Sequence, residues 1–232
     1  MKHVSQNTIA HNINVIKEQI SHFEQKYARK AGSVQLLAVS KTHPIDDIRA
    51  SLSVDQYHFG ENYLQDALTK IESIHEEAIK WHFIGPIQSN KTRQIAENFH
   101  WVHTIDRLKI AQRLSEQRNP ELPPINVCIQ VNVSDEKSKS GIHIEEALSL
   151  AKELVQLPNI RLRGLMTIPA ATSDFDLQRH AFGILRELKN ELHSQSIELD
   201  TLSMGMSNDM EAAIAEGSTM VRIGTAIFGA RN

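Results

Sequence analysis

The sequence has few of the features that mark secreted, membrane or nucleic-acid-binding proteins. Its 232 residues include a single cysteine, Cys128, so no intrachain disulfide can form and a reducing compartment is expected. No apolar run approaches the roughly 20 residues that a membrane helix needs, and the first ten residues lack a secretory core. The net charge of -3 offers no broad basic surface. We therefore expect a cytoplasmic protein that binds neither nucleic acid nor membranes.

What the sequence does contain is a regular alternation of apolar runs and amphipathic segments. A first helix is predicted over residues 4–30, where Ile9, Ile13 and Ile16 recur at helical spacing. Strand-like runs follow at residues 34–40, 56–60, 80–85, 101–106, 125–133, 160–168, 199–205 and 218–224. Helical patterns lie between them at residues 45–52, 63–78, 89–98, 108–117, 144–157, 177–194 and 209–215.

This alternation predicts parallel strands joined by helical crossovers. Eight such units in a chain near the usual length of about 250 residues favour a closed (β/α)8 barrel. We expect one domain over residues 1–232, with the first helix as an addition. A doubly wound open sheet is the alternative, but its Gly-x-Gly-x-x-Gly fingerprint is missing after the first strand, where "KTHPID" stands.

Lys41 ends the first strand, in the stretch "LLAVSKTHP". Strand alternation puts Leu37, Val39 and Lys41 on one face, and barrel active sites lie at the carboxyl ends of the strands. A partly desolvated amine there can form a Schiff base with a carbonyl. The alternative is a lysine that merely extends into solvent.

The turns after the last two strands predict a phosphate site. In "SMGMSNDMEAA", Ser207 and its neighbours can cap a helix, and Asn208 and Glu211 have the spacing of a capping box. In "RIGTAIFG", Gly224 and Thr225 can supply backbone N–H groups and a hydroxyl. Barrels frequently bind phosphate at these two loops, although ordinary capped turns would look similar.

Arg222 lies two residues before Gly224 and so shares its face of the last strand. A guanidinium only donates hydrogen bonds, and a pyridine nitrogen such as that of pyridoxal phosphate is a suitable acceptor. The alternative is a salt bridge to Glu61 or Asp209.

Other polar residues follow the middle strands. Asn62 could contact a ligand hydroxyl, or with Glu61 it could start the next helix. His82 is interpreted as a core histidine, and Lys137 and Lys139 as contacts to phosphate or water in a polar loop.

Seven segments together resemble the pyridoxal 5′-phosphate homeostasis protein (YggS/PROSC-like) family. They are "LLAVSKTHP", "FGENYLQ", "HFIGPIQSNK", "SDEKSKSGI", "RGLMTIP", "LSMGMSNDMEAAI" and "RIGTAIFGAR". The resemblance implies a barrel like the N-terminal domain of alanine racemase, with pyridoxal phosphate as its cofactor. It also implies a site made of the Schiff-base residue Lys41, the phosphate contacts Met206, Ser207, Gly224 and Thr225, the pyridine-nitrogen contact Arg222, and Asn62.

Two departures from the family pattern concern auxiliary lysines. Many members carry a second lysine two residues after the first, where this sequence has His43. Some members end in a lysine-bearing tail, whereas this sequence stops at Asn232. Roles of such lysines are therefore not transferred.

Three functions compete for this site. An amino-acid racemase needs a second base, which alanine racemase takes from a tyrosine of another domain; Tyr27, Tyr57 and Tyr63 all precede the last two strands. An arginine at the ring nitrogen would also weaken the ring as an electron sink. A Schiff-base aldolase leaves Arg222 without a role. We therefore predict a non-catalytic, monomeric pyridoxal phosphate carrier in vitamin B6 homeostasis, with apo forms of cofactor-dependent enzymes as candidate recipients.

Overall fold

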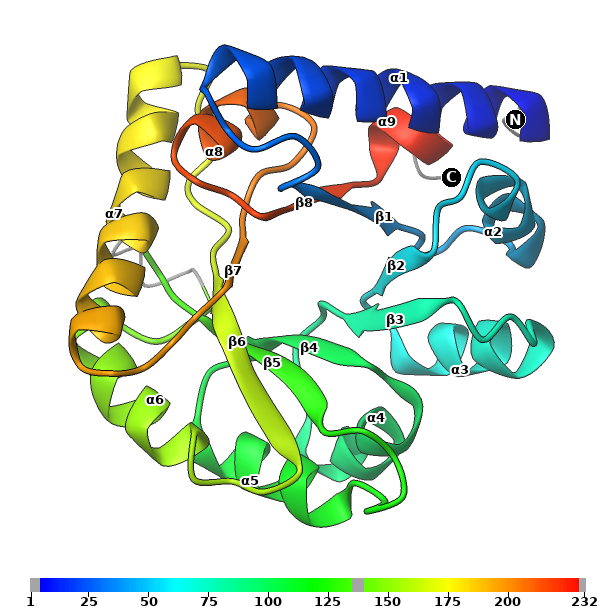
Figure 1. Cartoon of the computed structure of the whole chain (residues 1–232). Helices are drawn as coiled ribbons and strands as arrows, with labels where there is room; N and C mark the ends of the chain where they lie inside the picture. The colour runs from blue at the N-terminus through cyan, green and yellow to red at the C-terminus, as the bar shows by residue number, and fades with distance from the viewer. Residues whose placement is uncertain (1–4, 135–139, 230–232) are drawn as a thin grey trace.

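A closed barrel of parallel strands forms the centre of the molecule (Figure 1). The computed structural model describes residues 5–134 and 140–229. Its strands are β1 (Gln35–Val39), β2 (His58–Glu61), β3 (Lys80–Phe83), β4 (Trp101–Ile105), β5 (Ile125–Gln130), β6 (Ile160–Met166), β7 (Thr201–Ser203) and β8 (Met220–Ile223). They pair in chain order, and β8 pairs back onto β1 with Arg222 opposite Leu37. The predicted (β/α)8 barrel is confirmed, because an open sheet would leave β1 and β8 apart.

Helices surround the barrel in the order that the sequence predicts. They are α1 (Gln6–Lys26), α2 (Ile45–Leu52), α3 (Leu64–Ser73), α4 (Thr92–Asn98), α5 (Leu108–Gln117), α6 (Ala147–Leu154), α7 (Phe175–Ser194), α8 (Met210–Ala215) and α9 (Thr225–Phe228), with single 3-10 turns η1 (Ser89–Lys91) and η2 (Ile144–Glu146). Helix α9 was not predicted, because its four residues are too few to show helical periodicity.

Three predicted helices end earlier than expected; one of them is α6, which was predicted to reach residue 157 and stops at Leu154. Helix α1 was predicted to reach residue 30 but stops at Lys26, because the buried Glu24 carboxylate accepts the Gly32 and Val34 N–H groups and turns the chain back. Helix α3 was predicted to reach residue 78 but stops at Ser73, since Ile74 has extended backbone angles.

The N-terminal helix α1 covers the outside of the barrel beside α8 and α9 (Figure 1). Its buried face consists of isoleucines at helical spacing, Ile9, Ile13, Ile16 and Ile20. The Asn12 amide donates a hydrogen bond of 2.8 Å to the carbonyl of Ile227. This contact ties α1 to the short helix that follows the last strand.

The barrel interior combines a small apolar cluster with buried polar side chains. Trp101, Cys128 and Met166 pack together there, and burial raises the pKa of the Cys128 thiol to about 12, so it remains protonated. His82 and His103 are fully buried in the same space. The interior is thus filled with side chains, as in other barrels of this size.

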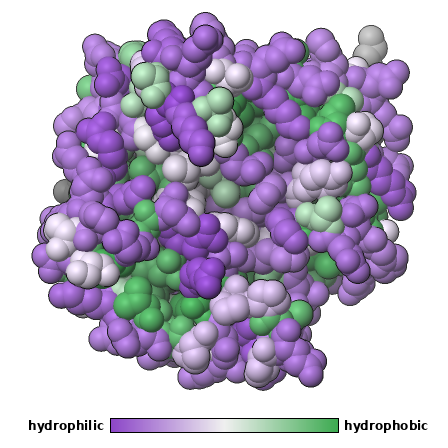
Figure 2. Space-filling model, in the orientation of Figure 1, coloured by the Kyte–Doolittle hydropathy of each residue, from purple (hydrophilic) through white to green (hydrophobic). Residues whose placement is uncertain are grey.

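The surface in Figure 2 is mostly hydrophilic, with apolar side chains in small separate areas. Among the described residues, no helix is both long and apolar enough to cross a membrane.

Candidate functional site

A cavity opens at the carboxyl ends of the strands. All seven predicted site residues line it: Lys41, Asn62, Met206, Ser207, Arg222, Gly224 and Thr225. Val39, Ile84 and Met166 contribute apolar wall. The barrel therefore brings together, in one cavity, residues that the sequence separates by more than 180 positions.

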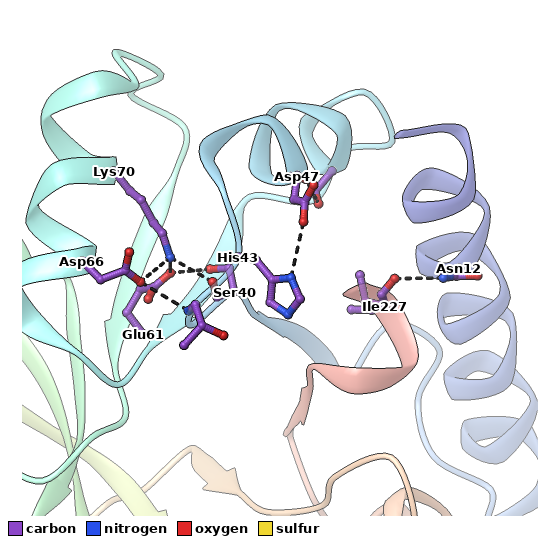
Figure 3. A network of polar contacts seen from close by, with 10 residues as sticks. Asn12, Ser40, His43, Asp47, Glu61, Asp66, Lys70 and Ile227 are labelled. Atoms are coloured by element: carbon purple, nitrogen blue, oxygen red, sulfur yellow. Dashed lines mark hydrogen bonds and ion pairs between the residues drawn. The ribbon is translucent and has the colours of Figure 1, made fainter. Parts of the chain in front are cut away.

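Lys41 lies two residues after the end of β1, and a buried polar network holds Ser40 between them (Figure 3). The Ser40 hydroxyl donates to Glu61 Oε1 at 2.6 Å. The Lys70 ammonium, reaching in from α3, donates to the Ser40 carbonyl and to Glu61 Oε1, both at 2.9 Å. Its third contact is Asp66 Oδ2 at 2.7 Å. The residue before Lys41 is thus bonded at both its hydroxyl and its carbonyl.

The residue after Lys41 is held in a strained conformation. Thr42 has φ of +66°, in the left-handed region that a β-branched residue rarely adopts. Its N–H donates to Asp66 Oδ2 at 3.3 Å. Backbone strain of this kind persists only where surrounding contacts enforce it, and it concentrates at functional sites.

Lys70 was not among the predicted site residues. Glu61 was considered as a helix-starting residue or as a partner of Arg222, and both alternatives are wrong. Helix α3 begins at Leu64 with no side-chain cap, and Glu61 pairs with Lys70. Burial raises the pKa of the Glu61 carboxyl, while the Lys70 charge acts to lower it. Along the sequence, Lys70 looks like the surface partner of Asp66 four residues earlier.

His43 also lines the cavity. Its Nδ1 lies 3.4 Å from Asp47 Oδ2, and its ring centroid lies 4.9 Å from that of Phe228. The side chain is 14% exposed. The imidazole is therefore held against α2 and α9 and does not extend into solvent.

Arg222 is buried, and backbone carbonyls hold it. Its Nη1 donates to the Ser203 carbonyl at 2.5 Å and to the Ser203 hydroxyl at 2.9 Å, and its Nη2 donates to the Thr167 carbonyl at 2.8 Å. Burial lowers its pKa to about 10, so it remains charged at neutral pH.

The alternative of a salt bridge from Arg222 to Glu61 is not found, because Glu61 pairs with Lys70. Within the described residues, no hydrogen bond or ion pair joins Asp209 to Arg222. The Asp209 charge still acts to raise the pKa of Arg222.

The loops after β7 and β8 present hydrogen-bond donors to the cavity. Gly205 has φ of +98°, and a Cβ there would lie 2.6 Å from that of Ala213, so only glycine fits this turn. Met206 and Ser207 follow it, and Thr225 opens α9. Within the described residues, neither the Ser207 nor the Thr225 hydroxyl has a protein partner in the hydrogen-bond network. Hydroxyl donors of this kind suit the phosphate of a phosphorylated ligand.

The predicted capping box between Asn208 and Glu211 is wrong. Asp209 is the N-cap residue of α8, and its carboxylate accepts the Met206 N–H at 2.5 Å. The Glu211 carboxylate instead accepts hydrogen bonds from Lys26 at 2.6 Å and Tyr27 at 2.9 Å.

Asn62 lines the cavity, and its backbone packs closely against Gly85, which follows β3. A Cβ at Gly85 would lie 2.2 Å from the Asn62 carbonyl oxygen, so a glycine is required there. His82 lies outside the cavity lining and is buried in the barrel interior, as the sequence indicated. Lys137 and Lys139 lie outside the described residues.

Comparison with known proteins places this chain in a family. The profile of the alanine racemase N-terminal domain matches residues 4–232. The pyridoxal phosphate homeostasis protein of Vibrio alginolyticus is 56% identical over 229 residues, covering 97% of this chain and 98% of that protein. This chain belongs to the family of pyridoxal phosphate homeostasis proteins.

Other relatives agree with this assignment. The pyridoxal phosphate homeostasis protein of Pseudomonas aeruginosa is 57% identical over 225 residues and is covered to 96%. Among solved structures, PipY of Synechococcus elongatus with PLP bound has a TM-score of 0.82 and 33% identity, covering 95% of this chain and 100% of that one. Alanine racemase of Corynebacterium glutamicum, at 17% identity and a TM-score of 0.75, shares the fold, and this chain covers 63% of it.

Proposed function

We propose that this protein binds pyridoxal 5′-phosphate in the cavity and serves intracellular pyridoxal phosphate homeostasis. The observation that carries the proposal is the donor set of one cavity: the Lys41 amine, the Arg222 guanidinium, and the Ser207 and Thr225 hydroxyls. When bound, the cofactor supplies an aldehyde that condenses with a lysine amine and releases water. The names of the relatives and the PLP-bound PipY structure support the same ligand.

Each residue has a separate task in this proposal. Lys41 is the point of covalent attachment. Ser207 and Thr225 hold the phosphate with their hydroxyls, helped by the backbone N–H of Gly224. Met206 lines the phosphate end beside them, while its own N–H is bonded to Asp209. Arg222 donates a hydrogen bond to the ring nitrogen, because a guanidinium has no acceptor. Asn62 contacts the ring hydroxyl.

We further propose that the protein holds the cofactor without catalysis. In the described cavity lining, His43 is the one imidazole that accompanies the Lys41 amine. Tyr27 bonds to Glu211, Tyr57 bonds to Asp55, and Tyr63 is exposed outside the lining. A cytoplasmic location, a monomeric single domain, and transfer of the cofactor to apo-enzymes complete the proposal.

Borohydride reduction followed by peptide mass mapping tests the attachment. We expect a pyridoxyl group on Lys41, and no labelled peptide in a Lys41→Ala variant. Lys109→Ala is the matched control, because Lys109 is exposed on α5, and it should label like the wild type. Labelling at another lysine in the wild type would refute the assignment of Lys41.

Incubation with L-alanine in heavy water tests the absence of catalysis. We expect no D-alanine carrying deuterium at Cα above the level of free pyridoxal phosphate. Rapid formation that His43→Ala abolishes would instead establish a racemase with His43 as the second base.

A further inference from the structure

A line of hydrogen-bonded side chains crosses the barrel interior and ends at Arg222. His58 Nδ1 lies 2.9 Å from His82 Nε2, and His82 Nδ1 lies 2.9 Å from His103 Nε2. His103 Nδ1 lies 2.8 Å from the Ser203 hydroxyl, which accepts from Arg222 Nη1 at 2.9 Å. Four of its five residues are at most 5% exposed: His82, His103, Ser203 and Arg222. The proposed function gives the three histidines no task.

Arg222 sets the direction of this line. A guanidinium can only donate, so the Ser203 oxygen is an acceptor toward it. The Ser203 hydroxyl has one hydrogen, and its other partner among the described residues is His103 Nδ1. If Nδ1 carried a proton, the serine hydrogen would be buried without an acceptor, which is costly. His103 Nδ1 is therefore the acceptor, and the proton of a neutral His103 sits on Nε2.

The same reasoning continues along the barrel. His103 Nε2–H donates to His82 Nδ1, so the proton of His82 is on Nε2 and faces His58 Nδ1. Each histidine must be neutral for this pattern to hold. Burial lowers the pKa of His103 to about 3, with the Arg222 charge acting in the same direction.

The other charged groups near the line agree with neutral rings. Burial is the main cause that lowers the pKa values of His82 and His58. Lys80, beside His58, lowers its pKa further, and His100 acts likewise on His82. Around Arg222 stand Asp209 and the Cys128 thiol.

We propose that His58, His82 and His103 form a one-directional hydrogen-bond line that fixes the Ser203 hydrogen toward His103 Nδ1, so that a lone pair of the Ser203 oxygen faces Arg222. The guanidinium then keeps one orientation, with its remaining N–H groups directed to the cavity that it lines. The three histidines are positioning residues, because they act on the ligand through Ser203 and Arg222. The effect on pyridoxal phosphate rests on the proposed function, whereas the direction of the line does not.

Nitrogen-15 NMR of histidine-labelled wild-type protein tests the direction, with and without added pyridoxal phosphate. Long-range proton–nitrogen spectra distinguish the two neutral tautomers. We expect His82 and His103 to be neutral at pH 7 with the proton on Nε2, with assignments from single substitutions. A proton on Nδ1 of either ring would overturn the proposal, whether or not the protein binds the cofactor.

Substitutions at position 103 test the effect on Arg222. His103→Asn keeps an acceptor oxygen near the place of Nδ1, whereas His103→Leu removes it. We expect pyridoxal phosphate affinity within about twofold of wild type for asparagine and about tenfold weaker for leucine, with a shifted cofactor absorption band. His100→Asn is the control, since His100 accepts the Trp81 N–H outside this line. Equal losses for asparagine and leucine would refute the positioning role, as would no loss for leucine.

If a position-103 variant fails to fold, the tautomers of the wild-type protein still decide the direction. If the wild-type protein does not bind pyridoxal phosphate, the proposed function fails, and the tautomer measurement still tests the line by itself.

Discussion

At the scale of single residues, Lys70 is a buried cation paired with the buried carboxylate of Glu61 and the partly exposed carboxylate of Asp66. Lys70 is 2% and Glu61 0% exposed, and removing one member of such a pair leaves an uncompensated charge in the core. We expect Lys70→Met to lower the free energy of unfolding by about 3–5 kcal/mol. Urea denaturation at pH 7 measures this change.

A double substitution separates the buried charge from lost packing. Glu61→Gln combined with Lys70→Met removes both charges and keeps an acceptor for the Ser40 hydroxyl, so most of the lost stability should return. Lys152→Met, on a residue exposed on α6, should change stability by no more than about 0.5 kcal/mol. If the double variant is as unstable as Lys70→Met, the pair is not the cause.

Thr225 tests the phosphate end of the cavity. Thr225→Val removes one hydroxyl and keeps the shape, so binding of pyridoxal phosphate should weaken by about 1–3 kcal/mol. Pyridoxal, which has no phosphate, provides the control and should bind both proteins equally. Titrations followed by absorbance measure both affinities. An equal loss for the two ligands would place the phosphate elsewhere.

The residues at strand ends could be predicted from the sequence, whereas their supporting partners could not. Lys41 and Arg222 stand out because strand alternation alone puts them at the mouth of a barrel. Lys70 reaches Glu61 from a neighbouring helix, and the contact between His82 and His103 depends on the register of adjacent strands. Sequence spacing carries no information on such contacts between elements.

At the scale of elements, α1 holds α9 in place through Asn12. Its amide donates to the Ile227 carbonyl, and α9 begins at Thr225 in the cavity. We expect Asn12→Ala to lower the free energy of unfolding by about 1 kcal/mol and to weaken pyridoxal phosphate binding a few-fold. Asn14→Ala, at an exposed position of the same helix, is the control and should change neither. Unchanged binding in both variants would show that α9 does not depend on α1.

The strands and long helices were predictable because each has its own apolar pattern. Helices α2 and α5 have the predicted bounds. The capping box was wrong because Glu211 bonds to Lys26 and Tyr27, near the end of a helix some 185 residues earlier. Local spacing cannot reveal a competing partner so far away along the chain.

At the scale of the whole molecule, buried neutral histidines make the fold sensitive to acid. The pKa of His103 falls from 6.5 to about 3 on burial, and that of the half-buried His100 falls to about 4. Below pH 6.5 the unfolded chain binds protons that these rings in the folded protein do not. The contribution of these neutral rings to the free energy of unfolding should therefore be fully present above pH 6.5. It should decrease as the pH drops toward the pKa values of the folded protein.

For His103 alone, the loss at pH 5 should be about 2 kcal/mol relative to pH 7, since each pH unit below 6.5 costs about 1.4 kcal/mol. His103→Asn removes this titration and keeps the acceptor toward Ser203, so its stability should fall less between pH 7 and pH 5. Urea denaturation at the two pH values gives the difference for each protein. His11→Asn, at an exposed position, should keep the wild-type pH dependence. If His103→Asn also kept it, His103 would be protonated in the folded protein at pH 5, and the hydrogen-bond line to Arg222 would be broken there.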